Sequence, residues 1–124
     1  MHSESYEVSD ETAERVHRAR AAGRPILAIG TTVVRALEDA AVRAAESNST
    51  TLVMAGKAEA RLFILPGFRF QVVNMLLTNF HLPRSTLLAL VCAFAGRECV
   101  LRAYRHAVET GYRFYSYGDC MLIR

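Results

Sequence analysis

The stretch ILAIGTTVVRALEDAAVRAA, residues 26–45, passes from a short apolar run into a helical pattern through one glycine and two threonines. The run 26–29 is typical of a buried strand. From Val33 to Ala45 the apolar residues recur at helical spacing and fall on one face. Because strands that alternate with helices build α/β folds, this stretch predicts an α/β fold class.

Working outward from this unit, the sequence predicts further elements on both sides. Toward the N-terminus, Ser9 and Asp10 begin a helix that Gly23 ends. Toward the C-terminus, the polar loop 47–51 precedes more strand and helix patterns. The expected strands are 62–65, 70–73, 76–80, 112–115 and 120–123, with a turn at 116–119, and the expected helices run from 84 or 85 to about 96 and from about 99 to 110.

These elements suit one domain, 1–124. With 124 residues, of which 52% are hydrophobic and 22% charged, the chain is long enough for a real core and does not resemble a disordered sequence. The helix after position 83 is apolar nearly all round, which predicts a place at the centre of that core. Since several strands come late in the chain, we expect a layered mixed sheet flanked by helices.

Charge, cysteine count and hydropathy narrow the function classes. Fifteen basic against twelve acidic residues give a net charge of +3, which weakly favours an anionic partner. The longest apolar run, 87–95, is nine residues against the ~20 that span a bilayer, so we expect no membrane association. Three cysteines without a chelating spacing argue against disulfides and a metal site, and they indicate a cytoplasmic protein.

The first cluster of candidate site residues lies where the strand 26–29 meets its helix. Gly30, Thr31 and Thr32 stand at a helix start, where free N–H groups and the helix dipole favour a carboxylate or phosphate. Arg35 follows one turn later. We expect these residues to bind an anionic group; the alternative is that Thr32 only caps the helix and Arg35 is solvated.

The second cluster, 78–86, follows a strand and opens a helix, which is where α/β proteins place ligands. A neutral imidazole at His81 can accept or donate a proton near pH 7. Asn79 offers a donor and an acceptor, Arg84 offers a bidentate clamp, and Ser85 stands at the helix start as a further substrate-binding candidate. The alternative is a histidine that only pins the turn by hydrogen bonds to the backbone.

The third cluster, 112–119, holds four aromatic residues and the carboxylate of Asp119. Aromatic rings such as Tyr117 stack on bases or face cations, and Asp119 suits a ribose diol or a cationic group. Ordinary packing is the alternative. Glu4 is a further candidate near the N-terminus. If the strand ends near positions 30, 80 and 118 converge, hydroxyl, imidazole and carboxylate share one cleft.

These clusters, in this order, resemble the C-terminal part of the S-adenosylmethionine:tRNA ribosyltransferase-isomerase family of the queuosine pathway. The resemblance spans essentially the whole chain. The most specific strings are Thr-Asn-Phe-His-Leu-Pro at 78–83 and Tyr-Gly-Asp at 117–119. Further matching strings are Met-His-Ser-Glu at 1–4, Ala-Ile-Gly-Thr-Thr at 28–32, Val-Arg at 34–35, Leu-Glu at 37–38, Phe-Ile at 63–64, Pro-Gly at 66–67, Val-Val at 72–73, Ser-Thr-Leu at 85–87, Ala-Phe-Ala-Gly at 93–96, Tyr-Arg-Phe at 112–114 and Ser at 116.

The resemblance implies an enzyme that transfers and isomerises the ribosyl group of S-adenosylmethionine onto 7-aminomethyl-7-deazaguanine in tRNA. Epoxyqueuosine forms, and adenine and methionine leave. S-adenosylmethionine is then a co-substrate, and no cofactor is implied. The family fold implies that this chain is the part of a larger α/β domain that follows an inserted β-barrel domain, with Met1 at an internal methionine. Such a part alone is expected to be inactive.

Three positions depart from the family pattern. Val33 replaces a usual serine, Asn74 stands where aspartate is common, and 57–61 lacks the expected Thr-Asp character.

The resemblance suggests His81 as general base, Asp119 and Tyr117 at the ribose or sulfonium, and the helix start with Arg35 at an anionic group. Two other functions stay open: a non-catalytic RNA-binding module, marked by salt-dependent tRNA affinity without turnover, and a structural remnant that binds nothing.

Overall fold

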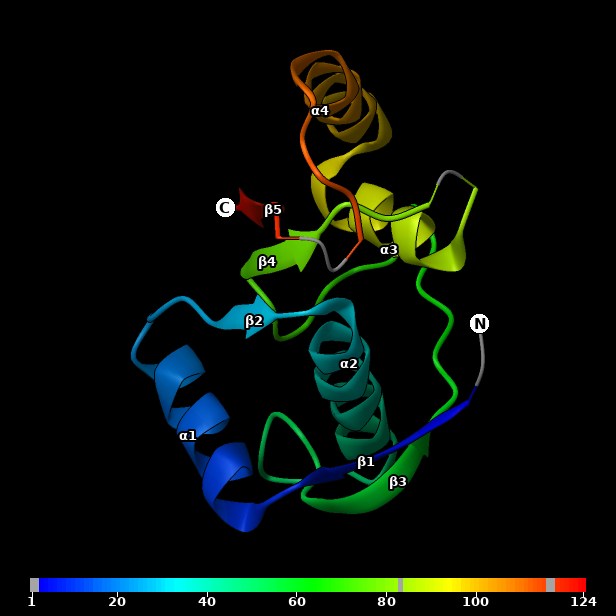
Figure 1. Ribbon diagram of the computed structural model, residues 1–124. Coiled ribbons are helices and arrows are strands. Elements are labelled where there is room, and N and C mark those ends of the chain that lie inside the picture. The colour runs from blue at the N-terminus through cyan, green and yellow to red at the C-terminus, as the bar shows by residue number, and fades with distance from the viewer. Residues whose placement is uncertain (1–2, 83, 116–117) are drawn as a thin grey trace.

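The computed structural model describes residues 3–82, 84–115 and 118–124 (Figure 1). The strands form two sheets, an antiparallel pair β1–β3 and a three-stranded sheet in the order β2–β4–β5. The α/β class is confirmed, with the strands divided between two sheets. In chain order the elements are β1 (Glu4–Val8), α1 (Asp10–Ala21), β2 (Leu27–Ile29), α2 (Thr31–Glu46), β3 (Gly56–Ala60), β4 (Met75–Asn79), α3 (Thr86–Ala95), α4 (Arg97–Thr110) and β5 (Cys120–Ile123).

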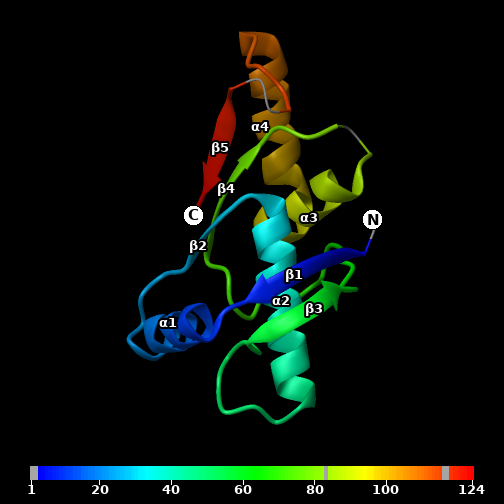
Figure 2. The same cartoon turned by 60° about the horizontal axis from the view of Figure 1, so that its bottom comes forward.

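The three-stranded sheet is mixed, as predicted. β2 and β4 are parallel, whereas β4 and β5 are antiparallel, so that Leu77 lies between Ile29 and Leu122 in the register. Helices α2, α3 and α4 lie on one side of this sheet (Figure 2). Ala28 and Leu76 point to that side and are fully buried. The core therefore lies between this sheet face and the helices.

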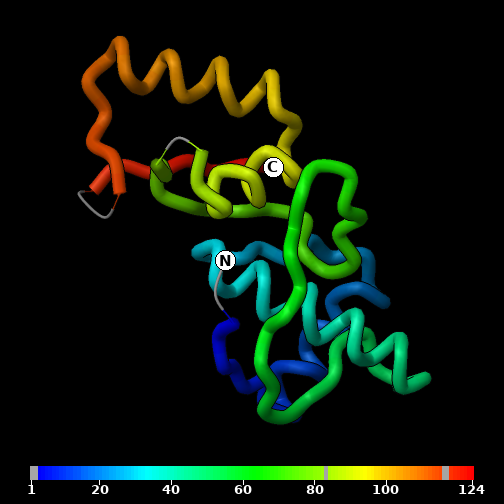
Figure 3. The backbone as a smooth tube through the Cα atoms, turned by 90° about the vertical axis from the view of Figure 1, so that its right-hand side faces the viewer, coloured from blue at the N-terminus to red at the C-terminus, as the bar shows by residue number. Residues whose placement is uncertain are grey.

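Helix α2 joins the two parts of the molecule, because it contacts strands of both sheets. It begins after Gly30, whose φ of +98° lies in the region that favours glycine. The N–H of Gly30 donates to the carbonyl of Leu77 at 2.8 Å, which continues the β2–β4 pairing up to the helix. The segment from β3 to β4, green in Figure 3, runs from the β1–β3 pair to the three-stranded sheet.

The other helices begin and end close to the predicted residues. The Ser9 hydroxyl accepts from the N–H of Thr12 at 3.1 Å at the start of α1. The Ser85 hydroxyl caps α3, whose central residues are buried as expected. Gly111 ends α4 in the left-handed region, with a φ of +82°.

The predicted strands 62–65 and 70–73 are wrong, because a side chain takes the backbone bonds of the second segment. Glu38 on α2 is fully buried. Its carboxylate accepts hydrogen bonds from the backbone N–H groups of residues 71–73 at 2.6–3.0 Å. Amides that bond to a carboxylate are not available for a neighbouring strand, so this segment stays outside both sheets.

Asp39 likewise accepts backbone hydrogen bonds at the start of the segment 62–65. Its Oδ1 accepts from the N–H groups of Arg61 and Leu62 at 3.1 and 3.2 Å. Its Oδ2 accepts from the Tyr6 hydroxyl and from Arg43 Nε, both at 2.8 Å. One carboxylate thus ties β1, α2 and the chain after β3 together.

The predicted strand 112–115 is also wrong, again because its amides bond elsewhere. The N–H of Arg113 donates to the Asp119 carboxylate, and that of Tyr115 donates to the carbonyl of Phe80 at 2.8 Å. The segment therefore folds back onto the end of β4 without joining the sheet. Its predicted turn falls partly on residues 116–117, outside the described residues.

The pair β1–β3 was not predicted, because its sequences lack the apolar alternation of a half-buried strand. ESYEV and GKAEA are mostly exposed, and Val8 and Ala60 are their buried residues. The positions 57–61, which depart from the family pattern, fall mainly in β3.

Of the three cysteines, Cys92 is buried and all are free thiols. Across residues 3–82, 84–115 and 118–124, no helix has the length and hydropathy to cross a membrane.

The stability of the chain is expected to depend on the ionisation of Asp39. Burial alone raises the pKa of Asp39, but hydrogen bonds from Arg43, Tyr6 and two amides outweigh it and hold the pKa below 3.8. Ionised Asp39 therefore stabilises the folded state fully above pH 3.8, and this stabilisation disappears as the pH falls through the lowered pKa of Asp39. Urea unfolding from pH 7 to pH 2.5 should show Asp39→Asn clearly destabilising at pH 7 and progressively less so in acid. An equal effect at all pH values would contradict this.

Candidate functional site

Three turns meet at one edge of the three-stranded sheet, where β2 and β4 end and β5 begins. Gly30 lies beside β4 through its bond to Leu77. On the other side Asn79 pairs in register with Cys120, and its Nδ2 donates to the carbonyl of Asp119 at 3.2 Å. The turns near 30, 80 and 118 are therefore neighbours, as expected. We call residues 30–32, 78–81 and 119 the polar edge.

His81 is held on two sides at the centre of the polar edge. Its Nε2 lies 2.8 Å from Oγ1 of Thr78, a buried residue of β4. Its backbone N–H donates to the Tyr104 hydroxyl on α4 at 2.8 Å. The residue is half-buried, and this burial lowers the pKa of His81 below its usual 6.5. The imidazole is therefore mainly neutral at pH 7 and positioned by its neighbours.

The pKa of His81 is directly measurable. NMR titration of the 124-residue chain should give a midpoint below 6.5 for His81, because burial disfavours the charged ring. A midpoint at or above 6.5 for His81 would show that the ring is not desolvated as the structure has it.

The remaining candidates of the second cluster have different surroundings. Ser85 Oγ accepts from the N–H of Leu88 at 3.1 Å and donates to the carbonyl of Leu82 at 2.7 Å. In this structure it is a helix cap. Arg84 is exposed, with a φ of +60° in the left-handed region. Its side chain is thus at the surface.

The first cluster splits between the polar edge and the interior. Thr31 is buried and Thr32 is exposed at the start of α2. Arg35 is buried, and its guanidinium reaches the end of β3, where it donates to the carbonyls of Ala60 and Leu62 at 3.0 and 2.9 Å. In the structure the guanidinium of Arg35 binds backbone carbonyls of the protein itself. Binding of an anionic ligand by Arg35 stays a prediction.

Glu4 lies with Arg35 rather than with the imidazole. Its Oε1 is 3.4 Å from Nη1 of Arg35, in an ion pair between β1 and α2. The Glu4 side chain keeps 48% of its surface exposed. The pair therefore fastens β1 onto α2 and leaves part of the carboxylate in solvent.

The third cluster supplies packing as well as a carboxylate. The ring of Phe114 stacks on that of Phe80, with centroids 5.1 Å apart, and packs edge-on against Tyr104. The Asp119 carboxylate bonds to Arg113, and the backbone N–H of Arg113 is the main cause that lowers the pKa of Asp119. Asp119 is thus ionised at the polar edge. Tyr117 lies outside the described residues.

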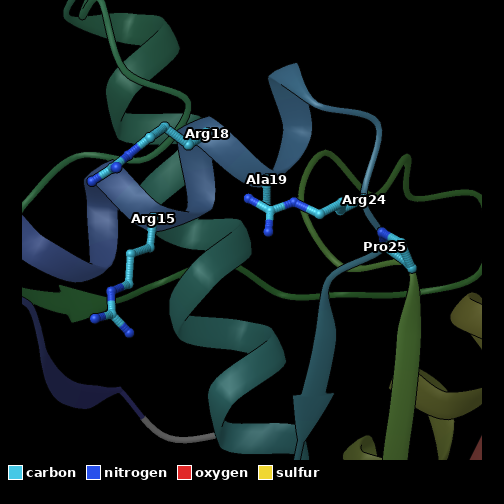
Figure 4. Close-up of a pocket in the computed structure, with 5 residues that line it drawn as sticks. All are labelled: Arg15, Arg18, Ala19, Arg24 and Pro25. Carbon is cyan, nitrogen blue, oxygen red and sulfur yellow. The ribbon is translucent and has the colours of Figure 1, made fainter.

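Two hollows in the described part of the chain differ in chemistry and position: one adjoins the polar edge, and the other lies at the opposite end of β2. An apolar groove of about 520 Å³ lies between α4 and β5, next to the polar edge, and includes Phe80, Tyr112 and Cys120 in its wall. The other, of about 500 Å³, lies at the end of α1 (Figure 4). It is lined by Arg15, Arg18, Ala19, Arg24 and Pro25.

The arginines of the second hollow do not form a converging anion site. Arg15 and Arg18 pair with Glu11 and Glu14 at 2.8 and 3.0 Å on the same helix. In Figure 4 their guanidinium groups point in different directions. Exposed ion pairs of this kind contribute little to the stability of the fold. The paired glutamates also offset the positive charge of the two arginines.

Asn74, which departs from the family pattern, lies away from the polar edge. It precedes β4, and its Oδ1 accepts from the N–H of Ile26 at 3.0 Å. The polar edge is at the other end of the strand. An amide oxygen makes this bond as a carboxylate would, so the departure leaves the site residues untouched.

Residues 1–123 match the sequence family described as Queuosine biosynthesis protein. The chain belongs to this family. In Sorangium cellulosum, the S-adenosylmethionine:tRNA ribosyltransferase-isomerase is 64% identical over 124 residues, which are 100% of this chain and 32% of that protein. The enzyme of the same name from Thermus thermophilus is 58% identical over 123 residues, 99% of this chain and 34% of that protein.

A solved structure has the same fold as this chain. The crystal structure of S-adenosylmethionine tRNA ribosyltransferase from Thermotoga maritima is similar with a TM-score of 0.82 at 48% sequence identity. The match covers 97% of this chain and 40% of that one. The chain spans about a third of the length of the curated relatives it matches.

Proposed function

We propose that this chain supplies part of the active site of an enzyme that transfers and isomerises the ribosyl group of S-adenosylmethionine onto 7-aminomethyl-7-deazaguanine in tRNA. Epoxyqueuosine forms, and adenine and methionine are released. S-adenosylmethionine acts as co-substrate, without a cofactor. Family membership supports this reaction. The observation that carries it to particular residues is the meeting of three turns at the polar edge around His81.

His81 is the general base in this proposal. The sulfonium of S-adenosylmethionine acidifies the adjacent carbon, and a neutral imidazole accepts the proton. With its ring proton on Nε2, His81 donates to Thr78 Oγ1 and keeps the Nδ1 lone pair for the substrate. The Tyr104 hydroxyl fixes the backbone that carries the ring.

The other residues of the polar edge bind substrate. Thr31 and Thr32 stand at the start of α2, where the helix dipole favours the methionine carboxylate or an RNA phosphate. Asp119 is ionised and suits the ribose hydroxyls or the cationic sulfur. Asn79 belongs to the polar edge, and Arg84 follows His81 by three residues in the chain. In this proposal both side chains donate hydrogen bonds to the substrate.

The 124 residues alone are expected to be inactive. They span about a third of the length of their relatives, and reacting groups must be held to within a fraction of an ångström for proximity to accelerate a reaction. A chimera tests the proposal, in which these 124 residues replace the matching third of the Sorangium cellulosum enzyme. With S-adenosylmethionine and tRNA that carries 7-aminomethyl-7-deazaguanine, we expect adenine release by the chimera and none by the 124-residue chain.

The outcomes separate the functions left open by the sequence. An inactive but folded chimera, with the parent enzyme active in parallel, would contradict the proposal. Salt-dependent tRNA binding without adenine release would favour an RNA-binding module. A folded chimera without affinity for tRNA or S-adenosylmethionine would indicate a structural remnant.

A further inference from the structure

The three-stranded sheet has one open face. Side chains alternate along a strand, so the neighbours of buried Ala28 and Leu76 point the other way. Leu27, Ile29 and Leu122 on this second face are 45%, 64% and 55% exposed. Within the described part of the chain, no helix lies against this side of β4 and β5 (Figure 2).

The open face is suited to burial. Its register places Leu27 beside Met75, and Leu77 between Ile29 and Leu122, which makes one continuous apolar surface. None of the residues in β2, β4 and β5 is charged. A face that lacks charge and exposes Leu27, Ile29 and Leu122 gains free energy when apolar protein surface covers it.

The open face continues into the apolar groove between β5 and α4. Cys120 and Leu122 belong to both surfaces. The groove is lined on the helix side by Val100, Ala103 and Ala107. β5 is also an edge strand, so an occupant of the groove can pair with its free side.

We infer that the open face and the groove are a docking surface for the polypeptide that family members carry outside the region matched by this chain. The relatives are about three times as long, so they have the chain to cover it. The open face and the groove together offer this polypeptide one surface, and a complex between two copies of the chain is the contrary outcome of the tests below.

Binding tests this inference. The 124-residue chain is mixed with the remaining two-thirds of the Sorangium cellulosum enzyme, and the Kd is measured by titration. We expect a complex that Ile29→Lys and Leu122→Lys each weaken at least 10-fold, because a lysine in the covered face is desolvated. Val108→Lys is the matched control: Val108 is 66% exposed, does not line the groove, and should change the Kd less than twofold.

A second measurement does not require the separate two-thirds to fold. In the chimera, Cys120 should react with a maleimide at least 10-fold more slowly than in the 124-residue chain, while a thiol introduced by Val108→Cys reacts equally in both. Equal reactivity of Cys120 would overturn the inference. So would a homodimer of the chain that Ile29→Lys dissociates. The inference rests on family membership, not on the proposed reaction, and protection of Cys120 without adenine release would leave it standing.

Discussion

Glu38→Ala is expected to lower the free energy of unfolding by about 3–5 kcal/mol. The carboxylate of Glu38 is fully buried and accepts hydrogen bonds from three consecutive amides, at 71–73. Alanine leaves the amides of Val72 and Val73 without their acceptor in the interior and also leaves a cavity. Since a buried donor without a partner costs about 1–3 kcal/mol, these two amides and the cavity account for the size of the effect.

Urea unfolding at pH 7 measures this loss. Glu38→Gln keeps the shape and one acceptor oxygen, so it should fall between the wild type and Glu38→Ala. Glu46→Ala is the control, because Glu46 is exposed at the end of the same helix and should change stability by no more than about 0.5 kcal/mol. A loss below about 1 kcal/mol for Glu38→Ala would show that other groups satisfy the three amides.

His81→Ala in the chimera is expected to slow adenine release about 10²–10⁴-fold, which is the usual contribution of a positioned general base. The affinity for tRNA should stay the same, because the substitution removes a proton acceptor and not a phosphate contact. The wild-type rate should fall in acid as His81 becomes protonated, below pH 6.5, since its pKa is lowered.

The control for this experiment is His17→Ala, at an exposed histidine of α1 away from the polar edge. It should leave both the rate and its pH dependence as they are. Adenine release by His81→Ala at the wild-type rate would remove His81 from the reaction, and a loss of tRNA binding in parallel with the rate would assign it to binding.

The helices and the individual strands of the three-stranded sheet were predictable because their signals are local. A cap such as Ser9 or Ser85, a glycine such as Gly30 and a run of apolar residues each act within one turn or strand. The strands 62–65 and 70–73 failed for the opposite reason. Amides of these segments bond to Asp39 and Glu38, and no local pattern shows which acceptor a distant amide finds.

The candidate site was predictable in its position more than in its details. Polar residues that follow strands gather at one sheet edge, and this brought residues near 30, 80 and 118 together. The burial of Arg35 was not predictable from local patterns. Its guanidinium lies inside the protein, where it donates to the carbonyls of Ala60 and Leu62 at the end of β3, and its role in anion binding stays a prediction. A local signal for the interior polar groups was the adjacent pair Glu38–Asp39, which lies between the apolar residues Leu37 and Ala40 on α2.

The central claim is that the reacting part of S-adenosylmethionine binds at the polar edge. A crystal structure of the chimera with S-adenosylmethionine tests it most directly. We expect the ribose within about 3.2 Å of the His81 ring or one water away, with the methionine carboxylate near the start of α2. Density for S-adenosylmethionine in the arginine-lined hollow at α1, or elsewhere out of reach of His81, would contradict it.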